Sequence, residues 1–326
     1  MKMIRLAQLT TLLLGGNLLL LSSHANATVL KLAHNLDNNH VVAVAFQHMA
    51  KEVNEQSHGS LKIRIYPNGQ MGGPRENLEM LQQGALDMTK AMASELEPFD
   101  SIFSIFSLPY LFSSSEQYHK VLYGPVEEEL ANHIKPKGLY PIGVYVGGSR
   151  SFYAKKPIRT PDDLKGLRVR VITTPTTIRM IQLLGGSPAP IPFGEVYTAL
   201  QQGVVDAAEN NIPSYVQTRH MEITPYFSAD QHTSIPDYLV ISTRSWNKLT
   251  AEQQKILKTA IEHSEQYEQK LWTAQVKKSK AQAIKVGVHF IEVDKTAFRE
   301  KLKPMWLEME KDPEQARLLK EIQAIQ

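Results

Sequence analysis

Two arginines share one face of a short predicted strand, LRVRV at 167–171. Apolar residues alternate with Arg168 and Arg170, so both guanidinium groups lie opposite the apolar side chains. Arg170 lies near the carboxyl end of the strand, where open α/β sheets bind their ligands. A planar guanidinium can hold a carboxylate through two parallel hydrogen bonds, which a lysine cannot do. The strand therefore offers recognition of a carboxylate, although an exposed arginine on an edge strand explains the same residues.

Motifs for catalysis are missing from the chain. The sequence has no GxSxG, no HExxH, no phosphate loop ending in GK[ST] and no GxGxxG, and its histidines are scattered. It has no cysteine, which excludes thiol catalysis, CxxC redox chemistry and cysteine-based zinc sites. We therefore predict that the protein is not an enzyme and that it uses no cofactor and no metal.

The first 27 residues have the composition of a cleaved export signal. Lys2 and Arg5 precede an apolar run over 6–21, and Ala25-Asn26-Ala27 forms an A-x-A cleavage site. An uncleaved membrane anchor is the alternative, but polar residues and glycines interrupt the run. No later segment approaches the roughly 20 apolar residues that a membrane span needs. We predict a signal peptide over 1–27 and a periplasmic protein.

Net charge gives no reason to expect a nucleic-acid partner. The export signal holds two of the 36 basic residues and none of the 33 acidic ones, which leaves 34 against 33 in the rest of the chain. That near-neutral balance lacks the excess of positive charge that binding to nucleic acid requires. Neither a coiled-coil repeat nor a large apolar patch can be recognised, so a monomer is the default expectation.

Strand and helix signals alternate along the chain, which is typical of α/β architecture. A strand at 29–34 precedes a helix that begins at His40 with Asn39 as its cap. LQQGALDM at 81–88 returns as LQQGVVDA at 200–207, each time at the end of an amphipathic helix. In both copies we expect the glycine to end the helix with positive φ and the two residues before Asp to start a buried strand. The repeat predicts two similar lobes with a cleft between them.

One long helix is predicted to connect the lobes. From Thr250 to Val286 there is no Gly or Pro, and Thr250 and Gln253 form a capping-box pair. Apolar residues keep a helical period through this segment. A helix of about 37 residues is about 55 Å long, more than the width of one lobe, so we expect it to cross both. A break within the segment is the alternative.

Several segments resemble the solute-binding, DctP-like subunits of tripartite ATP-independent periplasmic (TRAP) transporters. They are GGSRSFYAKKPI (147–158), DLKGLRVRV (163–171), GGSPAPIPFGEVYTALQQGVVDAAEN (185–210) and, more weakly, GALDM (84–88) and LPYLF (108–112). The resemblance covers essentially the whole chain after the export signal. It implies an α/β fold, a two-lobed periplasmic-binding-protein clamshell with the long helix crossing both lobes. It also implies capture of an organic acid in the cleft and delivery to integral-membrane permease subunits.

The resemblance also predicts how the lobes divide the chain. Lobe I would contain 28–147 and about 236–270, and lobe II would contain 148–235 and about 271–326. The hinge would then follow Gly147-Gly148, where the chain first crosses between the lobes.

Four residues of lobe II match ligand-contacting positions of the family. Arg170 matches the arginine that reads the ligand carboxylate, and Arg150 matches a second arginine at the cleft. Asn210 matches a ligand-contacting asparagine, and Phe193 an aromatic residue beside the carboxylate. From the residues alone, Arg150 would be a surface loop charge and Asn210 a turn residue, whereas Phe193 is equally explained as core.

Hydroxyl-reading candidates would approach the other end of the ligand. Asn35, His40 and Glu76 are the candidates of lobe I, and His232 and Asp237 belong to the segment that returns to it. Each has a structural alternative. His40 would start a helix, Glu76 would complement a helix dipole, and Asp237 would accept hydrogen bonds in a turn.

The residue types at that end favour a sugar acid. Sialic-acid binders of the family tend to have a glutamate where this chain has Met92, and the segment 230–237 resembles members that bind hexuronates such as glucuronate and galacturonate. The alternative ligand is a C4-dicarboxylate such as succinate or malate, which needs a second cation, with Arg75 as the main candidate. A sensor module that binds the same acid for a receptor kinase is the alternative to a transporter subunit.

Overall fold

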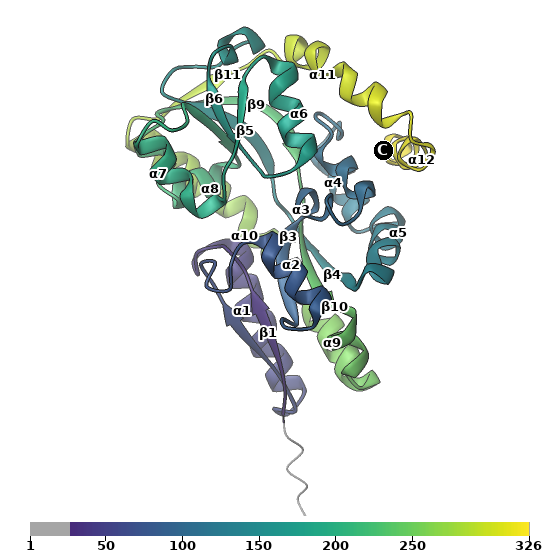
Figure 1. The fold of residues 1–326 in the computed structure, drawn as a ribbon. Helices are drawn as coiled ribbons and strands as arrows, with labels where there is room; N and C mark the ends of the chain where they lie inside the picture. The colour runs from purple at the N-terminus through teal and green to yellow at the C-terminus, as the bar shows by residue number, and fades with distance from the viewer. Residues whose placement is uncertain (1–26, 326) are drawn as a thin grey trace, which may run out of the picture.

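A computed structural model describes residues 27–325, which form two β-sheets with helices packed on them (Figure 1). The strand order is β2-β1-β3-β10-β4 in one sheet and β11-β9-β5-β8-β6-β7 in the other. The predicted signal peptide, apart from its last residue, lies outside the described residues. No helix within 27–325 is long and apolar enough to cross a membrane.

The two sheets have the same frame. Three parallel strands, β2-β1-β3 in one sheet and β7-β6-β8 in the other, are followed by an antiparallel strand, β10 or β5, and its antiparallel neighbour, β4 or β9. β10 and β5 each enter their sheet directly after the chain leaves the other one, so each lobe is completed by a strand that crosses over. The strands are β1 (Thr28–Ala33), β2 (Leu61–Tyr66), β3 (Met88–Met92), β4 (Leu139–Tyr145), β5 (Ser149–Ala154), β6 (Arg168–Val171), β7 (Ser187–Pro190), β8 (Ala207–Asn210), β9 (Tyr226–Ser234), β10 (Asp237–Ser242) and β11 (His289–Glu292).

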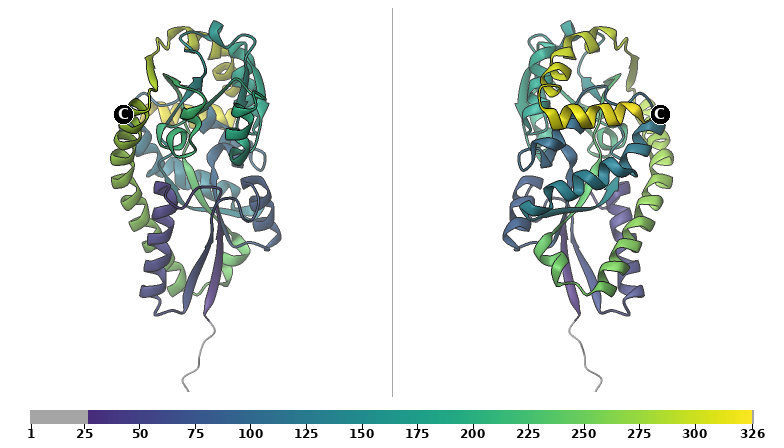
Figure 2. Two further views of the ribbon diagram at one scale, coloured as in Figure 1. Left: turned by 90° about the vertical axis from the view of Figure 1, so that its left-hand side faces the viewer. Right: turned by 90° about the vertical axis from the view of Figure 1, so that its right-hand side faces the viewer.

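Helices cover the sheets of both lobes, as the side views in Figure 2 show. The α-helices are α1 (Val41–Gln56), α2 (Pro74–Gln83), α3 (Ala93–Leu96), α4 (Ser115–Leu122), α5 (Pro125–Ile134), α6 (Pro175–Leu184), α7 (Val196–Gln201), α8 (Ile212–Gln217), α9 (Thr243–Lys248), α10 (Ala251–Lys285), α11 (Thr296–Met309) and α12 (Pro313–Ala324). The 3₁₀ helices are η1 (Ser101–Ser107), η2 (Lys135–Lys137), η3 (Pro161–Leu164), η4 (Phe193–Glu195) and η5 (His220–Glu222).

The repeated sequence forms the same helix-to-strand connection in both lobes. Gly84 and Gly203 follow α2 and α7 with φ of 77° and 68°, the left-handed conformation that glycine adopts at least cost. The buried strand starts later than predicted. It begins after Asp87 in β3 and after Asp206 in β8, instead of with the two residues before each aspartate.

The two aspartates explain why the strands start late. Asp87 Oδ2 accepts a hydrogen bond from the Lys31 N–H of β1 at 2.8 Å, and Asp206 Oδ2 accepts one from the Arg168 N–H of β6 at 2.9 Å. Each carboxylate therefore occupies the place of a backbone carbonyl at the edge of the ladder, and regular pairing begins only beyond it.

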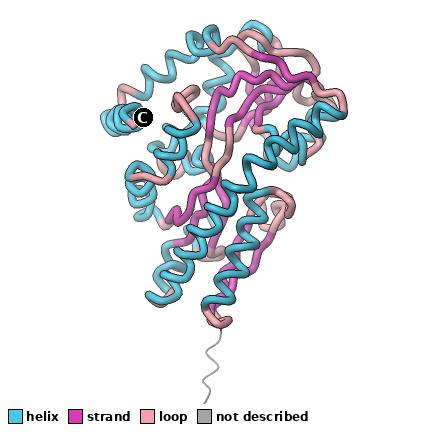
Figure 3. Tube along the Cα trace, turned by 180° about the vertical axis from the view of Figure 1, so that it is seen from behind, coloured by secondary structure: helices cyan, strands magenta, loops and turns pink. Residues whose placement is uncertain are grey.

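The long helix α10 spans both lobes, as predicted, and Figure 3 shows its course across the molecule. It is 35 residues long, and the capping box between Thr250 and Gln253 is present at its start. It packs on α1 and β4 of the first sheet's lobe and on α8 of the other. A single continuous helix therefore contacts both lobes.

The two crossover segments run side by side where the lobes meet. A Cβ on Gly147 would collide with the carbonyl of Ile235, and one on Gly148 would collide with the ring of Trp272 in α10. Gly148 also has φ of 63°. The close approach of the crossovers to each other and to α10 therefore requires glycine at both positions.

The C-terminal helices lie on different lobes. α11 packs against α6, whereas α12 packs against α5 and η1. Gln117 of α4 donates hydrogen bonds to the carbonyls of Ile322 and Ile325 at 2.9 Å each. The predicted boundaries of the lobes remain a prediction. These contacts place α12 on elements of lobe I, whereas the prediction assigned residues 271–326 to lobe II.

Candidate ligand-binding site between the lobes

A cavity lies between the lobes, at the ends of strands from both sheets. Most of the site residues predicted from the sequence line it, namely Asn35, His40, Arg150, Arg170, Phe193, Asn210 and Asp237. The rest of its lining is Leu36, Lys90, Met92, Gly147, Asn211, Ser214 and Ile235. Strands β3 and β10 of one sheet and β5, β6 and β8 of the other contribute to this lining, so residues of both lobes form the site.

Arg170 is buried in the wall of this cavity. Its strand β6 lies between β8 and β7, and its exposed fraction is 4%, so the interpretation of an exposed arginine on an edge strand is wrong. Nε donates to the carbonyl of Ile191 at 2.9 Å, and the guanidinium carbon lies 5.9 Å from the ring centre of Phe193. Loss of hydration lowers the pKa of Arg170. Within residues 27–325 its terminal nitrogens have no hydrogen-bond acceptor and no carboxylate at ion-pair distance, which leaves them available to an anion.

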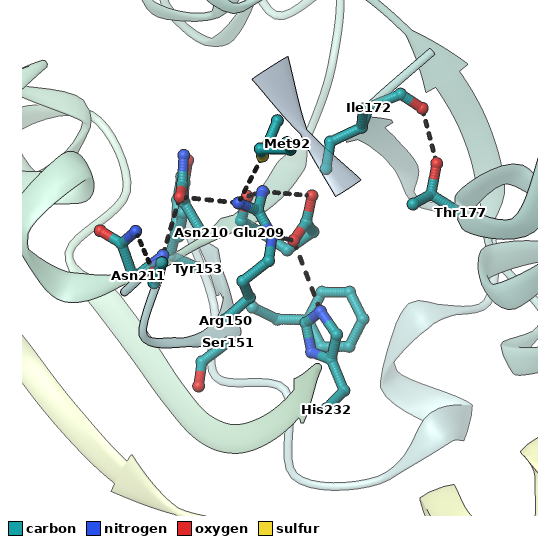
Figure 4. A network of polar contacts seen from close by, with 12 residues as sticks. Met92, Arg150, Ser151, Tyr153, Ile172, Thr177, Glu209, Asn210, Asn211 and His232 are labelled. Atoms are coloured by element: carbon teal, nitrogen blue, oxygen red, sulfur yellow. Dashed lines mark hydrogen bonds and ion pairs between the residues drawn. The ribbon is translucent and has the colours of Figure 1, made fainter. Parts of the chain in front are cut away.

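Arg150 is equally buried but is paired within the protein. Nε and Nη2 donate to the two carboxylate oxygens of Glu209 at 2.5 and 2.9 Å, and Nη1 donates to Asn210 Oδ1 at 3.0 Å (Figure 4). Glu209 therefore occupies, in bidentate geometry, the two donors that would otherwise hold a ligand carboxylate. Arg150 can therefore offer a ligand only what Nη1 has free, whereas Arg170 can offer both of its terminal nitrogens.

His232 lies behind Arg150 and outside the cavity, contrary to its predicted place among the hydroxyl readers. Its Nε2 is 3.4 Å from Glu209 Oε2, its Nδ1 is 2.8 Å from Asp230 Oδ2, and its ring stacks on Phe152. His232 belongs to β9 of the lobe II sheet, and its side chain is fully buried there.

The charges of this network support one another. Burial alone would lower the pKa of His232, but Asp230 and then Glu209 outweigh it and raise that pKa to about 9. Burial likewise opposes ionisation of Glu209, yet Arg150 and His232 hold its pKa at about 2. The four side chains thus form a buried chain of alternating charge that holds Arg150 in place.

Lobe I contributes a second buried ion pair, which the sequence did not reveal. Lys90 Nζ lies 2.6 Å from Asp237 Oδ1, with side chains exposed to 4% and 9%. The pair joins β3 to β10, where Asp237 is opposite Met92. A lysine inside the otherwise uncharged strand MTKAM is the one signal that could have pointed to it, because a buried lysine needs a partner.

Asn35 and His40 add neutral polar groups to the lobe I face. Asn35 Oδ1 is buried and has no hydrogen-bond partner among the described residues. His40, instead of the predicted Asn39, is the N-cap of α1, where its Nδ1 accepts from the Val42 N–H at 3.3 Å. Burial lowers the pKa of His40 to about 4, so its ring is neutral at pH 7.

Glu76 does not reach the cavity. It is exposed in the first turn of α2, where a negative charge complements the helix dipole, as the structural alternative proposed. Arg75 also turns outward and pairs with Glu79 at 3.1 Å on the same helix. Neither residue supplies charge to the site.

The fold and the site define a class of protein. Two α/β lobes, joined by paired crossovers and a spanning helix, enclose a buried guanidinium that has no acidic partner within residues 27–325. This is the architecture of a solute-binding protein that closes on an anion. The model of the DctP family, described as bacterial extracellular solute-binding protein, family 7, matches residues 32–312, and the chain belongs to this family.

Relatives and solved structures agree with this assignment. The chain is 38% identical to the uncharacterised protein YiiZ of Salmonella typhimurium over 91% of both chains. It is similar to a TRAP periplasmic solute-binding protein of Xanthobacter autotrophicus with bound β-D-galacturonate, at 33% identity and a TM-score of 0.89 over 91% of this chain and all of that one. A TRAP periplasmic solute-binding protein of Chromohalobacter salexigens with bound D-glucuronate is 31% identical, with a TM-score of 0.88 over the same shares. The predicted resemblance to TRAP solute-binding subunits is confirmed.

Proposed function

We propose that this protein captures a hexuronate, such as D-glucuronate or D-galacturonate, between its lobes and delivers it to the permease subunits of a TRAP transporter. The observation that carries this proposal is Arg170, a buried guanidinium whose two terminal nitrogens have no acceptor among the described residues. A single uncompensated cation suits a ligand with a single carboxylate. The uronates bound to the similar proteins of Xanthobacter and Chromohalobacter have this chemistry.

The opposite face of the cavity favours sugar hydroxyls over a second carboxylate. Lys90 is neutralised by Asp237, His40 is neutral, and Arg75 points away from the site. Among the described residues, a C4-dicarboxylate would therefore find no free cation on the lobe I side of the cavity. A sugar finds acceptors instead, namely Asn35 Oδ1 and the Asp237 carboxylate, which suit hydroxyl donors.

Capture requires the lobes to move, because the residues of the site are almost entirely covered. Arg150, Arg170 and Asn210 are each exposed to 4%, so a ligand cannot enter while the lobes are closed. The paired crossovers at Gly147 and Ile235 are the connections about which the lobes would open. The proposal includes export to the periplasm by the segment 1–27.

The test is thermal denaturation of the chain from Thr28 onward with D-glucuronate, D-galacturonate, succinate, L-malate and D-glucose. A ligand at 100 times its dissociation constant stabilises the folded state by about 2.7 kcal/mol, which appears as a raised midpoint. We expect a shift with one or both uronates and none with D-glucose, which has the hydroxyls without the carboxylate. A shift with succinate or malate in place of the uronates would contradict the uronate proposal.

A further inference from the structure

Glu97 makes a contact between the lobes at some distance from the ligand. It follows α3 on lobe I, and its Oε1 accepts hydrogen bonds from Thr176 Oγ1 at 2.7 Å and from the Thr176 N–H at 3.2 Å. Thr176 lies in the first turn of α6 on lobe II. The contact therefore bridges the two segments that leave the cavity directly after Met92 and Arg170.

Helix α6 depends on this contact for part of its N-terminal capping. Thr174 is its N-cap but makes no side-chain bond to the helix backbone, because its hydroxyl pairs with Thr177 Oγ1 at 2.9 Å. The first N–H groups of a helix lack partners within the helix and attract negative charge. The carboxylate of Glu97 meets this need, but only while the lobes are closed.

The other edge of the cleft has a weaker counterpart. Gln217, at the end of α8, donates to the carbonyl of Asn39, just before α1, at 3.4 Å. By the shared frame of the sheets, α8 corresponds to α3 and α1 to α6, so the two contacts occupy equivalent places with the lobes exchanged. The Glu97 contact is the shorter of the two and is the one that carries a charge.

We propose that Glu97 is an interlobe latch, a positioning residue that holds the lobes closed over the bound ligand by capping α6 and thereby slows its release. It does not line the cavity, so it acts on closure and not on ligand contacts. The proposal rests on the proposed function only for the choice of a uronate as the ligand in its test.

Burial of the carboxylate limits the strength of this latch. Glu97 is exposed to 9%, and its second oxygen, Oε2, has no hydrogen-bond partner among the described residues. Loss of hydration accordingly raises the pKa of Glu97, partly offset by the bonds from Thr176. Opening would return the carboxylate to water. The latch therefore opposes opening by the free energy of the bonds from Thr176 minus the cost of keeping the carboxylate out of water. A small net value suits a site that must also release its ligand.

The first experiment measures release of D-glucuronate by stopped flow from Glu97→Ala, Thr176→Val and the double variant. We expect Glu97→Ala to raise the release rate about tenfold with little change in the association rate, because the capping bonds form after ligand entry. Thr176→Val should add little to Glu97→Ala, since both remove one contact. Glu79→Ala, which removes a half-buried lobe I carboxylate that pairs with Arg75 on its own helix, is the matched control.

A second measurement needs no ligand and so separates the latch from the proposed function. The chain has no cysteine, so Lys51→Cys on lobe I and Lys165→Cys on lobe II, both exposed, allow spin labels to be placed selectively. We expect Glu97→Ala to shift the interlobe distances towards the open form, while Glu79→Ala leaves them unchanged. Failure of every uronate to bind would refute the proposed function alone. Release rates and interlobe distances that are the same with and without the Glu97 side chain would overturn the latch.

Discussion

The two lobes have the same framework but opposite charges at its equivalent positions. Counted from Leu81 and Leu200 of the repeat, Lys90 and Glu209 occupy the same place on β3 and β8. Each pairs with the strand that crosses over from the other lobe, Lys90 with Asp237 on β10 and Glu209 with Arg150 on β5. The repeated backbone therefore fixes the position of a buried ion pair, but it does not fix which strand carries the basic residue and which the acidic one.

The difference that matters for the ligand is one additional residue. Lobe II has Arg170 on β6 beside its ion pair, whereas β1 and the segment after it bring neutral groups, Asn35 and His40, to the lobe I side of the cavity. The pairs cancel within each lobe, so Arg170 gives the cavity its polarity. Arg170 thereby orients a ligand that has a carboxylate at one end and hydroxyls at the other, before any residue forms a hydrogen bond to those hydroxyls.

The largest effect should come from breaking the pair of lobe II. Glu209→Ala leaves Arg150 buried without a carboxylate and should lower the free energy of unfolding by about 3–5 kcal/mol, as measured by urea denaturation. The double variant Glu209→Leu with Arg150→Met removes both charges and should recover much of that loss. If Glu209→Ala is as stable as the wild type, the buried network is not structural.

Removing Arg170 should affect binding and not folding. Arg170→Ala should weaken uronate binding by about 2–5 kcal/mol, because the ligand carboxylate would be buried unpaired, and calorimetry measures this directly. Arg170→Lys keeps the charge without the fork and should fall between the two proteins. The free energy of unfolding should not fall in parallel, since this guanidinium has no acidic partner in the part of the chain that the structure describes. Wild-type affinity in Arg170→Ala would eliminate its assigned role.

Histidines of the two lobes should respond to pH in opposite directions. The pKa of His232 is raised to about 9, so its stabilising contribution is complete below about 6.5 and is lost as the pH rises through 9. The pKa of His40 is lowered to about 4, so its contribution is present above about 6.5 and is lost as the pH falls through 4. Between pH 7 and 9 the loss attributable to His232 should be on the order of 2 kcal/mol.

Nuclear magnetic resonance of labelled histidine rings checks this assignment directly. At pH 7 His232 should be protonated and His40 neutral. The free energy of unfolding of the wild-type protein, measured against pH, can be compared with that of His232→Asn and of His40→Asn. A neutral His232 at pH 7 would show that Asp230 and Glu209 do not outweigh its burial.

The smallest predicted effect concerns the ligand end that faces lobe I. Asp237→Asn leaves Lys90 without its counter-ion and removes a strong hydroxyl acceptor, so uronate binding should weaken about tenfold. The same change frees a cation opposite Arg170, so succinate should bind better than it does to the wild type. Calorimetry with both ligands tests this, and an unchanged preference would show that the pair does not discriminate between them.

Local features of the fold were predictable from the sequence, because each depends on residues a few positions apart. The capping box of α10, its length and the glycines after α2 and α7 were all predicted and are confirmed. The cap of α1 was assigned to Asn39 where His40 provides it, an error of one residue that follows from judging a cap by residue type alone. The late start of β3 depends on an aspartate that bonds to another strand, which no local pattern reveals.

The binding site was predictable only in part. The sequence by itself determined the repeated framework, the place of Arg170 at the end of a strand and the absence of thiol chemistry, because periodicity, spacing and composition carry this information directly. Tertiary structure alone decided which charges are paired. Arg150 and Glu209 stand 59 residues apart, and the lysine of β3 finds its aspartate on a strand that returns from the other lobe. Whether a buried charge is neutralised depends on which distant segments meet around it, and that is why Arg170 rather than Arg150 is left free for an anion.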